Sequence, residues 1–133
     1  HVLELDPTRF IPAPGQGALA IETRADDVET RRLVNPLNDA ATASCVAAER
    51  GFLAALGAGC LAPAGALAVV AGDTLVLEAM VGYPDGRSQK RDRVQGVPDS
   101  AAALGAALAQ RLFNAGGDLI LREVRDASGP GGS

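Results

Sequence analysis

The sequence predicts an α+β fold in which a three-stranded antiparallel sheet is covered by helices on one face. Three segments with the composition of strands follow one another, at 66–70, 74–81 and 87–94. Ala71-Gly72-Asp73 joins the first two segments and Pro84-Asp85-Gly86 joins the last two, and both connections have the chemistry of tight turns. Helical patterns stand on both sides of the strands, an order that is typical of an α+β layer.

Two helices precede these strands. The first begins at Asp26-Asp27, whose negative charges the helix dipole favours, and stops before Asn35-Pro36. The second has Asn38 or Asp39 as its N-cap and ends at Gly57. Its apolar face consists of Ala41, Cys45, Ala48, Phe52 and Leu56.

A long alanine-rich helix follows the strands. It runs from a cap at Asp99 or Ser100 to about Asn114, where two glycines close it. Residues 118–124 then form a last short helix. The Gly/Pro/Ser-rich residues 128–133 are expected to be a disordered tail.

The first 35 residues do not fit this layer. Residues 2–6 alternate apolar and acidic side chains like the end of a strand, and 18–23 alternate like a short strand. Between them, two prolines and two glycines within 12–17 indicate a stiff connector followed by a hinge. The segment is therefore a partial strand-hinge-strand-helix unit without partner strands. We expect residues 1–35 to be mobile or packed against a second copy.

Composition and charge exclude several classes of function. A net charge of -4, with no long basic run, argues against a nucleic-acid partner. No stretch approaches the roughly 18 apolar residues of a membrane span, and no basic-then-apolar signal begins the sequence. We therefore expect a cytoplasmic protein with no membrane partner. Because only 3% of the residues are aromatic, its core is built from small aliphatic side chains.

The two cysteines occupy different settings. Cys45 lies within the helical pattern before the strands, where core packing explains it. Cys60 lies in the small-residue loop Leu56–Pro63, where a sulfur without bulky neighbours can carry a covalent group. The alternative for Cys60 is a small buried hydrophobe. The different settings favour two free thiols over a disulfide.

Two motifs carry a resemblance to a known family. The stretch at 11–22, IPAPGQGALAIE, is the more specific, and the Ala48-Glu49-Arg50 helix followed by the Cys60 loop is the second. In this order and spacing, the chain closely resembles the C-terminal part of porphobilinogen deaminase, also called hydroxymethylbilane synthase. The resemblance runs from about Leu5 to Arg125 and covers less than half of the family's usual length.

This resemblance implies a transferase of tetrapyrrole and heme biosynthesis. Family members condense four porphobilinogen molecules into the linear tetrapyrrole hydroxymethylbilane and release ammonia. They build it on a dipyrromethane cofactor, which a thioether joins to a cysteine that Cys60 matches. Gln16, Gly17 and Ala18 match the hinge motif that lines the cofactor cleft, and the alternative for them is a hinge without ligand contact.

Three charged residues also match family positions. Arg24, Glu49 and Arg50 could form ion pairs between domains or contact the acetate and propionate groups of the pyrroles. Surface salt bridges are the alternative, and the commoner fate of such residues.

The resemblance also implies a division of the chain. Residues 1–35 correspond to the hinge and to parts of the family's first two domains, and 36–127 to the C-terminal cofactor-attachment domain. The catalytic aspartate of the family belongs to the first domain, so we expect no catalytic residue among these 133 residues and no activity of the chain alone. The full-length family member is expected to be monomeric, and self-association of the isolated chain is one expected outcome.

A second class of function stays open at this point. An α+β domain of this size could be a non-catalytic interaction module. Residues 1–35 would then be an arm that pairs with the sheet edge of another chain.

Overall fold

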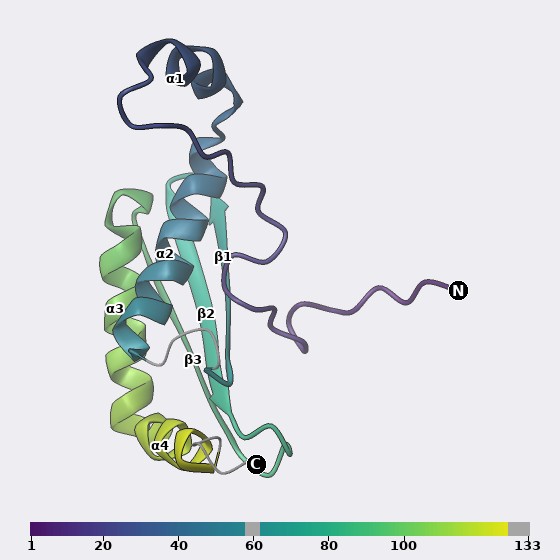
Figure 1. The fold of residues 1–133 in the computed structure, drawn as a ribbon. Coiled ribbons are helices and arrows are strands. Elements are labelled where there is room, and N and C mark those ends of the chain that lie inside the picture. The colour runs from purple at the N-terminus through teal and green to yellow at the C-terminus, as the bar shows by residue number, and fades with distance from the viewer. Residues whose placement is uncertain (58–61, 128–133) are drawn as a thin grey trace, which may run out of the picture.

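The computed structural model describes residues 1–57 and 62–127, and it has the predicted α+β architecture (Figure 1). Short 3-10 turns at Asn35–Leu37 and Pro98–Ser100 and a wide π-turn at Phe113–Gly117 join some of the elements. The helices and strands are, in chain order, α1 (Val28–Val34), α2 (Ala40–Leu56), β1 (Ala64–Ala71), β2 (Thr74–Gly82), β3 (Gln89–Gly96), α3 (Ala101–Leu112) and α4 (Asp118–Ala127). The predicted tail at 128–133 lies outside the described residues.

The sheet has the order β1-β2-β3 with both pairs antiparallel, as expected from two successive hairpins. Each hairpin turn contains a glycine with a positive φ, 59° at Gly72 and 75° at Gly86. Such left-handed backbone is the reason that glycine stands in these turns. The strand ends lie within about two residues of the sequence prediction, the usual uncertainty of such boundaries.

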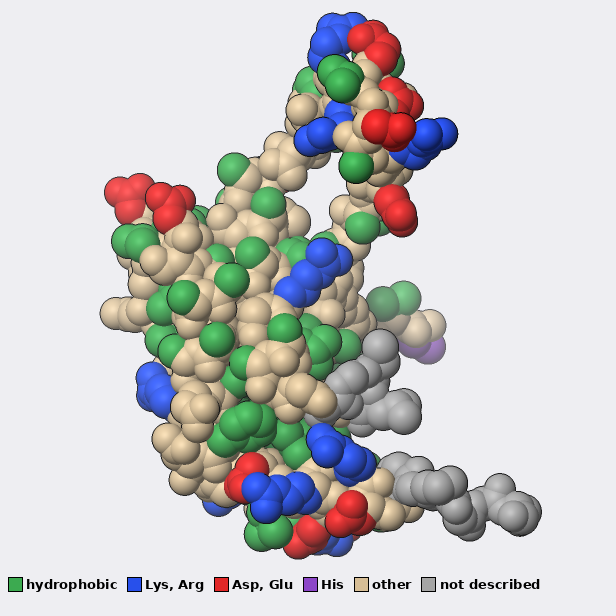
Figure 2. Space-filling model, turned by 60° about the vertical axis from the view of Figure 1, so that its left-hand side comes forward, with side chains coloured by type: hydrophobic (Ala, Val, Ile, Leu, Met, Phe, Trp, Pro, Cys, Tyr) green, Lys and Arg blue, Asp and Glu red, His purple; other side chains and the backbone are tan. Residues whose placement is uncertain are grey.

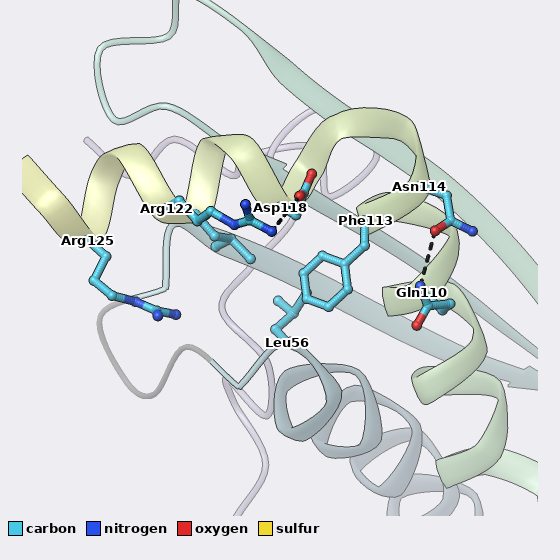
Figure 3. A pocket seen from close by; sticks show the side chains of 8 residues that line it. Leu56, Gln110, Phe113, Asn114, Asp118, Arg122 and Arg125 are labelled. Atoms are coloured by element: carbon cyan, nitrogen blue, oxygen red, sulfur yellow. Dashed lines mark hydrogen bonds and ion pairs between the residues drawn. The ribbon is translucent and has the colours of Figure 1, made fainter.

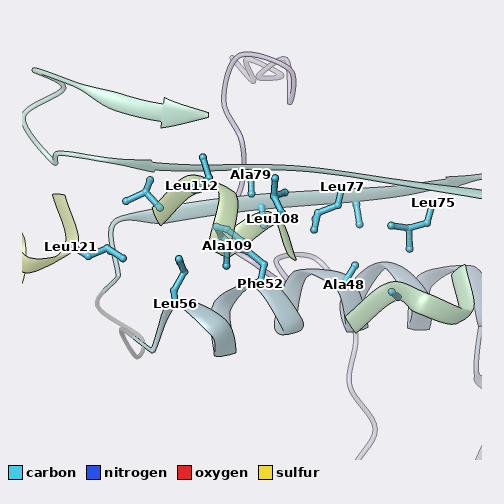
Figure 4. Close-up of a cluster of buried hydrophobic side chains, with 14 of the residues drawn as sticks. Ala48, Phe52, Leu56, Leu75, Leu77, Ala79, Leu108, Ala109, Leu112 and Leu121 are labelled. Atoms are coloured by element: carbon cyan, nitrogen blue, oxygen red, sulfur yellow. The ribbon is translucent and has the colours of Figure 1, made fainter. Parts of the chain in front are cut away.

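Helices α2, α3 and α4 pack on one face of the sheet and enclose the core between the two layers (Figure 4). Alternate residues of β2 point into this core and are buried, which is the period of two expected for a half-buried strand. Phe52 on α2 is the aromatic side chain among the fully buried residues of the described chain. The largest of these residues are Phe52, Leu75, Leu77, Leu108, Leu112 and Val81.

Helices α2 and α3 approach so closely that their backbones nearly touch. A Cβ atom at Gly105 would overlap the carbonyl oxygen of Ala48 and lie 2.5 Å from the amide nitrogen of Phe52. From the other side, a Cβ atom at Gly51 would lie 2.5 Å from the carbonyl oxygen of Ala102. Glycine is therefore required at both positions by the absence of space, and both helices are otherwise rich in alanine where they meet.

The predicted helix ends are confirmed with small differences. Asp27 and Asp39 act as N-caps, and their carboxylates accept hydrogen bonds from the amides of Thr30 (2.9 Å) and Thr42 (2.7 Å). Gly57 ends α2 in the left-handed conformation. The last helix, α4, extends beyond the predicted 118–124.

The predicted strands at 2–6 and 18–23 are wrong. Residues 1–27, all of them described, contain no strand. Alternating side chains favour a strand only where a neighbouring strand accepts its backbone hydrogen bonds, and the sheet offers none to these two segments.

Residues 18–37, which we call the arm, project from the body of the domain (Figures 1 and 2). No residue of α1 is buried, and Arg32 forms an ion pair with Glu29 on its surface (2.8 Å). Apolar side chains on the arm are exposed as well, namely Leu19, Ile21, Val28, Leu33 and Leu37. The expectation for residues 1–35 is wrong for 8–15, however, because this segment packs on the chain's own sheet, as described below.

The α2–α3 contact makes a prediction about stability. In most helices Gly→Ala is favourable, because alanine has the higher helix propensity. At Gly105 the overlap with backbone atoms of α2 outweighs that gain, so Gly105→Ala should lower the free energy of unfolding by about 1–3 kcal/mol. Urea unfolding followed by circular dichroism measures the change.

The matched control is Ala106→Gly on the exposed side of the same helix, which should cost about 1 kcal/mol through propensity alone. A Gly105→Ala variant as stable as the unsubstituted chain would contradict the close approach of α2 and α3.

Candidate cofactor-binding site

The three hinge residues predicted from the sequence lie in two consecutive turns at 13–18. The amide of Gln16 donates to the carbonyl oxygen of Ala13 (3.0 Å), and the amide of Ala18 donates to that of Gly15 (3.3 Å). Gly15 and Gly17 have φ values of 75° and 83°, which side chains rarely tolerate. A Cβ atom at Gly17 would meet no atom within 4 Å, so the backbone there is open to an approaching ligand.

The side chain of Gln16 stabilises its own turn. Its Oε1 accepts a hydrogen bond from the amide of Ala13 (3.1 Å), which complements the backbone bond in the opposite direction. Gln16 is exposed and Ala18 is half-buried. The turn is thus fixed internally while its outer surface remains accessible.

The segment before this turn is docked on the sheet. The amide of Ala66 in β1 donates to the carbonyl oxygen of Pro12 (2.9 Å), and Ile11 packs against Gly65. Arg91 in β3 donates to the carbonyl oxygen of Thr8 and forms an ion pair with Glu78 (2.6 Å). Residues 8–12 therefore run from β3 to the edge of β1, across the face of the sheet that the helices leave uncovered.

Glu49 connects the turn to both layers of the domain. This α2 side chain is only 6% exposed. Its Oε2 accepts a hydrogen bond from the amide of Gly15 (2.6 Å), and its Oε1 accepts one from the amide of Ala68 in β1 (2.8 Å). The sequence suggested an ion pair or a carboxylate contact for Glu49, and the geometry gives it two backbone donors instead.

Cys60 lies outside the described residues, so its accessibility stays a prediction. The residues on either side of its loop are in place: α2 ends at Leu56 with Gly57 as its cap, and β1 begins at Ala64. The structure therefore places the turn at 13–18 beside the strand that follows Cys60 in the chain, through the contacts of Ala66 and Ala68.

Cys45 is a free thiol that packs against the core from α2, as predicted. Burial raises its pKa above the ordinary value, and the negative charge of Glu49 raises it further. A hydrogen bond from the backbone of Val70 acts in the opposite direction and is the smaller effect. Because the thiolate is the reactive form, Cys45 is a poor nucleophile at neutral pH.

The two arginines singled out from the sequence lie on the surface. Arg24 forms an ion pair with Asp26 (3.0 Å), and both side chains are more than two-thirds exposed. Such a pair contributes little to stability. Arg50 is an exposed residue of α2, beside Glu49 in the sequence but not buried with it.

A cavity that the sequence analysis missed lies where α2, α3 and α4 meet (Figure 3). Its volume is about 360 Å³, and it is open to solvent. Asp118 pairs with Arg122 (3.1 Å) on its rim, and Gln110 donates to Asn114 (3.1 Å). Its lining residues are Leu56, Gln110, Phe113, Asn114, Asp118, Leu121, Arg122 and Arg125. The sequence feature that could have indicated this cavity was the spacing of Arg122 and Arg125, which places them on one face of a helix.

Within the residues that the structure describes, no group of three or more acidic, cysteine or histidine side chains could hold a metal ion. The described helices also include none that is long and apolar enough to cross a membrane.

Comparison with known proteins identifies two family models in the chain. Residues 43–114 match the porphobilinogen deaminase C-terminal domain, and residues 1–32 match the porphobilinogen deaminase dipyromethane cofactor binding domain. The first match covers more than half of the chain and spans α2, the sheet and α3.

Similar curated proteins carry the same name. The chain is 49% identical over 129 residues to the porphobilinogen deaminase of Acidothermus cellulolyticus. This alignment covers 94% of this chain and 39% of that protein. It is 47% identical to the porphobilinogen deaminase of Roseiflexus castenholzii, with 88% of this chain and 38% of that protein covered. It is 44% identical to that of Deinococcus radiodurans, with 92% of this chain and 40% of that protein covered. The chain thus spans about two-fifths of the length of these relatives.

The difference between the two cysteines makes a prediction. With limiting iodoacetamide at neutral pH, Cys60 should be alkylated faster than Cys45, because the pKa of Cys45 is raised and its sulfur is half-buried. Peptide mass spectrometry over a time course gives the two rates. Equal rates, or faster modification of Cys45, would contradict the prediction, and labelling in denaturant controls for intrinsic differences.

Proposed function

Because the chain belongs to the porphobilinogen deaminase family, we propose that it forms the C-terminal part of an enzyme that condenses four porphobilinogen molecules into hydroxymethylbilane with release of ammonia. The observation that carries this proposal is the docking of the hinge turn onto the domain. Gln16, Gly17 and Ala18 lie in the part that matches the cofactor-binding model, and Glu49 and β1 hold this part against the C-terminal domain.

In this proposal Cys60 holds the dipyrromethane cofactor through a thioether. The bound dipyrromethane would supply a covalent primer, on which further pyrrole units are added. The matched family model is that of the dipyromethane cofactor binding domain, which supports this cofactor for the family. The small residues around Cys60 in the sequence would leave a bulky dipyrrole room to extend from the sulfur.

Gln16, Gly17 and Ala18 are proposed to line the cofactor cleft. The support is the open space at Gly17, where a flat pyrrole ring could lie against the backbone without meeting a side chain. The internal hydrogen bonds of the turn keep this surface in one conformation. Exposed Arg50 is available to pair with the acetate or propionate group of a pyrrole, and Arg24 would first have to leave Asp26.

We further propose that catalysis needs residues beyond these 133, because the resemblance places the family's catalytic aspartate in the first domain. The exposed apolar side chains of the arm fit this view. Leu19, Ile21 and Val28 would pack against the first two domains in a longer protein. Porphobilinogen and the growing oligopyrrole are then partners of that longer protein, and this chain alone is inactive.

The alternative of a non-catalytic interaction module has one observation in its favour, which is the same exposed arm. The two functions differ in what happens at Cys60. An interaction module needs no covalent group on this sulfur, whereas the proposed enzyme does.

Intact mass spectrometry tests the proposal. A longer protein that contains this chain and the family's N-terminal domains should carry a dipyrrole-sized mass increment. Cys60→Ser should abolish stable loading, because a hydroxyl oxygen is a much weaker nucleophile than sulfur toward a soft carbon centre. Cys45→Ser is the matched control and should retain the increment.

The 133-residue chain alone should lack the increment, because assembly of the cofactor requires the missing domains. An increment on the isolated chain would refute that requirement. An active longer protein that loads the cofactor on Cys60→Ser would refute the role of Cys60.

A further inference from the structure

Glu49 is the buried charged side chain of the described part of the chain, and its surroundings are unusual for a carboxylate. On α2 it directly follows the fully buried Ala48 and lies one helical turn after Cys45. Burial of a carboxylate is costly unless hydrogen bonds replace the lost water. Here two backbone amides, those of Gly15 and Ala68, provide the replacement.

The two amides belong to different parts of the structure. Ala68 is in β1, on the side of the strand that faces away from β2, where the amide would otherwise lack an acceptor. Gly15 is in the hinge turn, 34 residues before Glu49 in the sequence. One carboxylate therefore joins α2, the edge of the sheet and the hinge turn.

Each of the neighbouring edge positions has its own acceptor. The amide of Ala66 donates to the carbonyl oxygen of Pro12, and the backbone of Val70 makes a hydrogen bond with the sulfur of Cys45. The hydrogen bond from the amide of Ala68 to Oε1 of Glu49 follows the same pattern, so this edge amide of β1 also has an acceptor. The bond from Oε2 to Gly15 adds nothing to the sheet and serves only to hold the hinge turn.

We propose that Glu49 is a positioning residue, which fixes the hinge turn at 13–18 relative to the helix and the strand that flank Cys60. Its side chain sets how far the turn can move from the domain, because a short bond to a buried acceptor tolerates little displacement. We call the hydrogen bond from the amide of Gly15 to Glu49 the tether. Its functional meaning rests on the proposed function, in which the turn lines the cofactor cleft. The tether itself does not depend on that function.

The amide of Gly15 reports the tether directly. In the 133-residue chain, hydrogen exchange by NMR should show the Gly15 amide protected about tenfold or more relative to the Gly17 amide of the same turn. The Gly15 proton should also resonate downfield, as short bonds to carboxylates cause. This measurement needs no variant and holds even if a substitution prevents folding.

Glu49→Gln tests the role of the carboxylate. The amide keeps one acceptor oxygen but presents its NH₂ group to the second backbone donor, so only one of the two bonds can survive. Because Ala68 is held in the sheet and Gly15 lies in a turn, we expect the oxygen to stay with Ala68. We expect the Gly15 amide to exchange about tenfold faster and its proton to move upfield, while the amides of Leu77 and Val81 in β2 change less than about twofold. Glu123→Gln on α4, which removes a carboxylate paired with Arg87 and in no contact with residues 8–18, is the matched control and should leave Gly15 unchanged.

Two outcomes would overturn the proposal: a Gly15 amide that exchanges as fast as Gly17 in the unsubstituted chain, or a Glu49→Gln variant in which Gly15 and the β2 amides lose protection equally. The latter would mean that Glu49 supports the fold as a whole. Neither outcome bears on whether Cys60 carries a dipyrrole, so the mass measurement can fail independently of this one.

Discussion

The close approach of α2 and α3 is the constraint on which the rest of the structure depends. With Gly51 and Gly105 at the contact, the two helices form one thin layer over the sheet, and alanine and leucine side chains suffice to fill the space between the layers. The position of α2 then determines where Glu49 meets the sheet edge and where the chain leaves the helix toward Cys60.

The parts of the fold that the sequence predicted are those in which local chemistry decides the structure. The glycines at 72 and 86 determine the hairpins, and the aspartates at 27 and 39 begin the helices, because each satisfies a requirement of its own neighbours. The wrong strands at 2–6 and 18–23 have the same origin. Their alternation is real, but a strand also requires a partner, which no local pattern reveals.

The candidate site was predictable to a different degree. The turn around Gln16 was identified from its glycines and its resemblance to a family motif, and the positive φ of Gly15 and Gly17 explains why glycine is needed there. The role of Glu49 was not predictable, because its partners are backbone amides 34 and 19 residues away. Nearly every residue has a backbone amide, so the sequence does not indicate which ones bind a given carboxylate. An acidic residue directly after Ala48, on the apolar face of the predicted helix, was the available hint.

The docking of residues 8–15 changes how the two matched parts of the chain relate to each other. The part that matches the cofactor-binding model does not simply precede the C-terminal domain, since Thr8, Pro12 and Gly15 all bond to it. The arm, most of which belongs to the same matched part, lies beyond these contacts and carries its own exposed apolar side chains. If other domains move in a longer protein, the motion is expected to be taken up in the arm, whereas the hinge turn stays with the domain that contains Cys60.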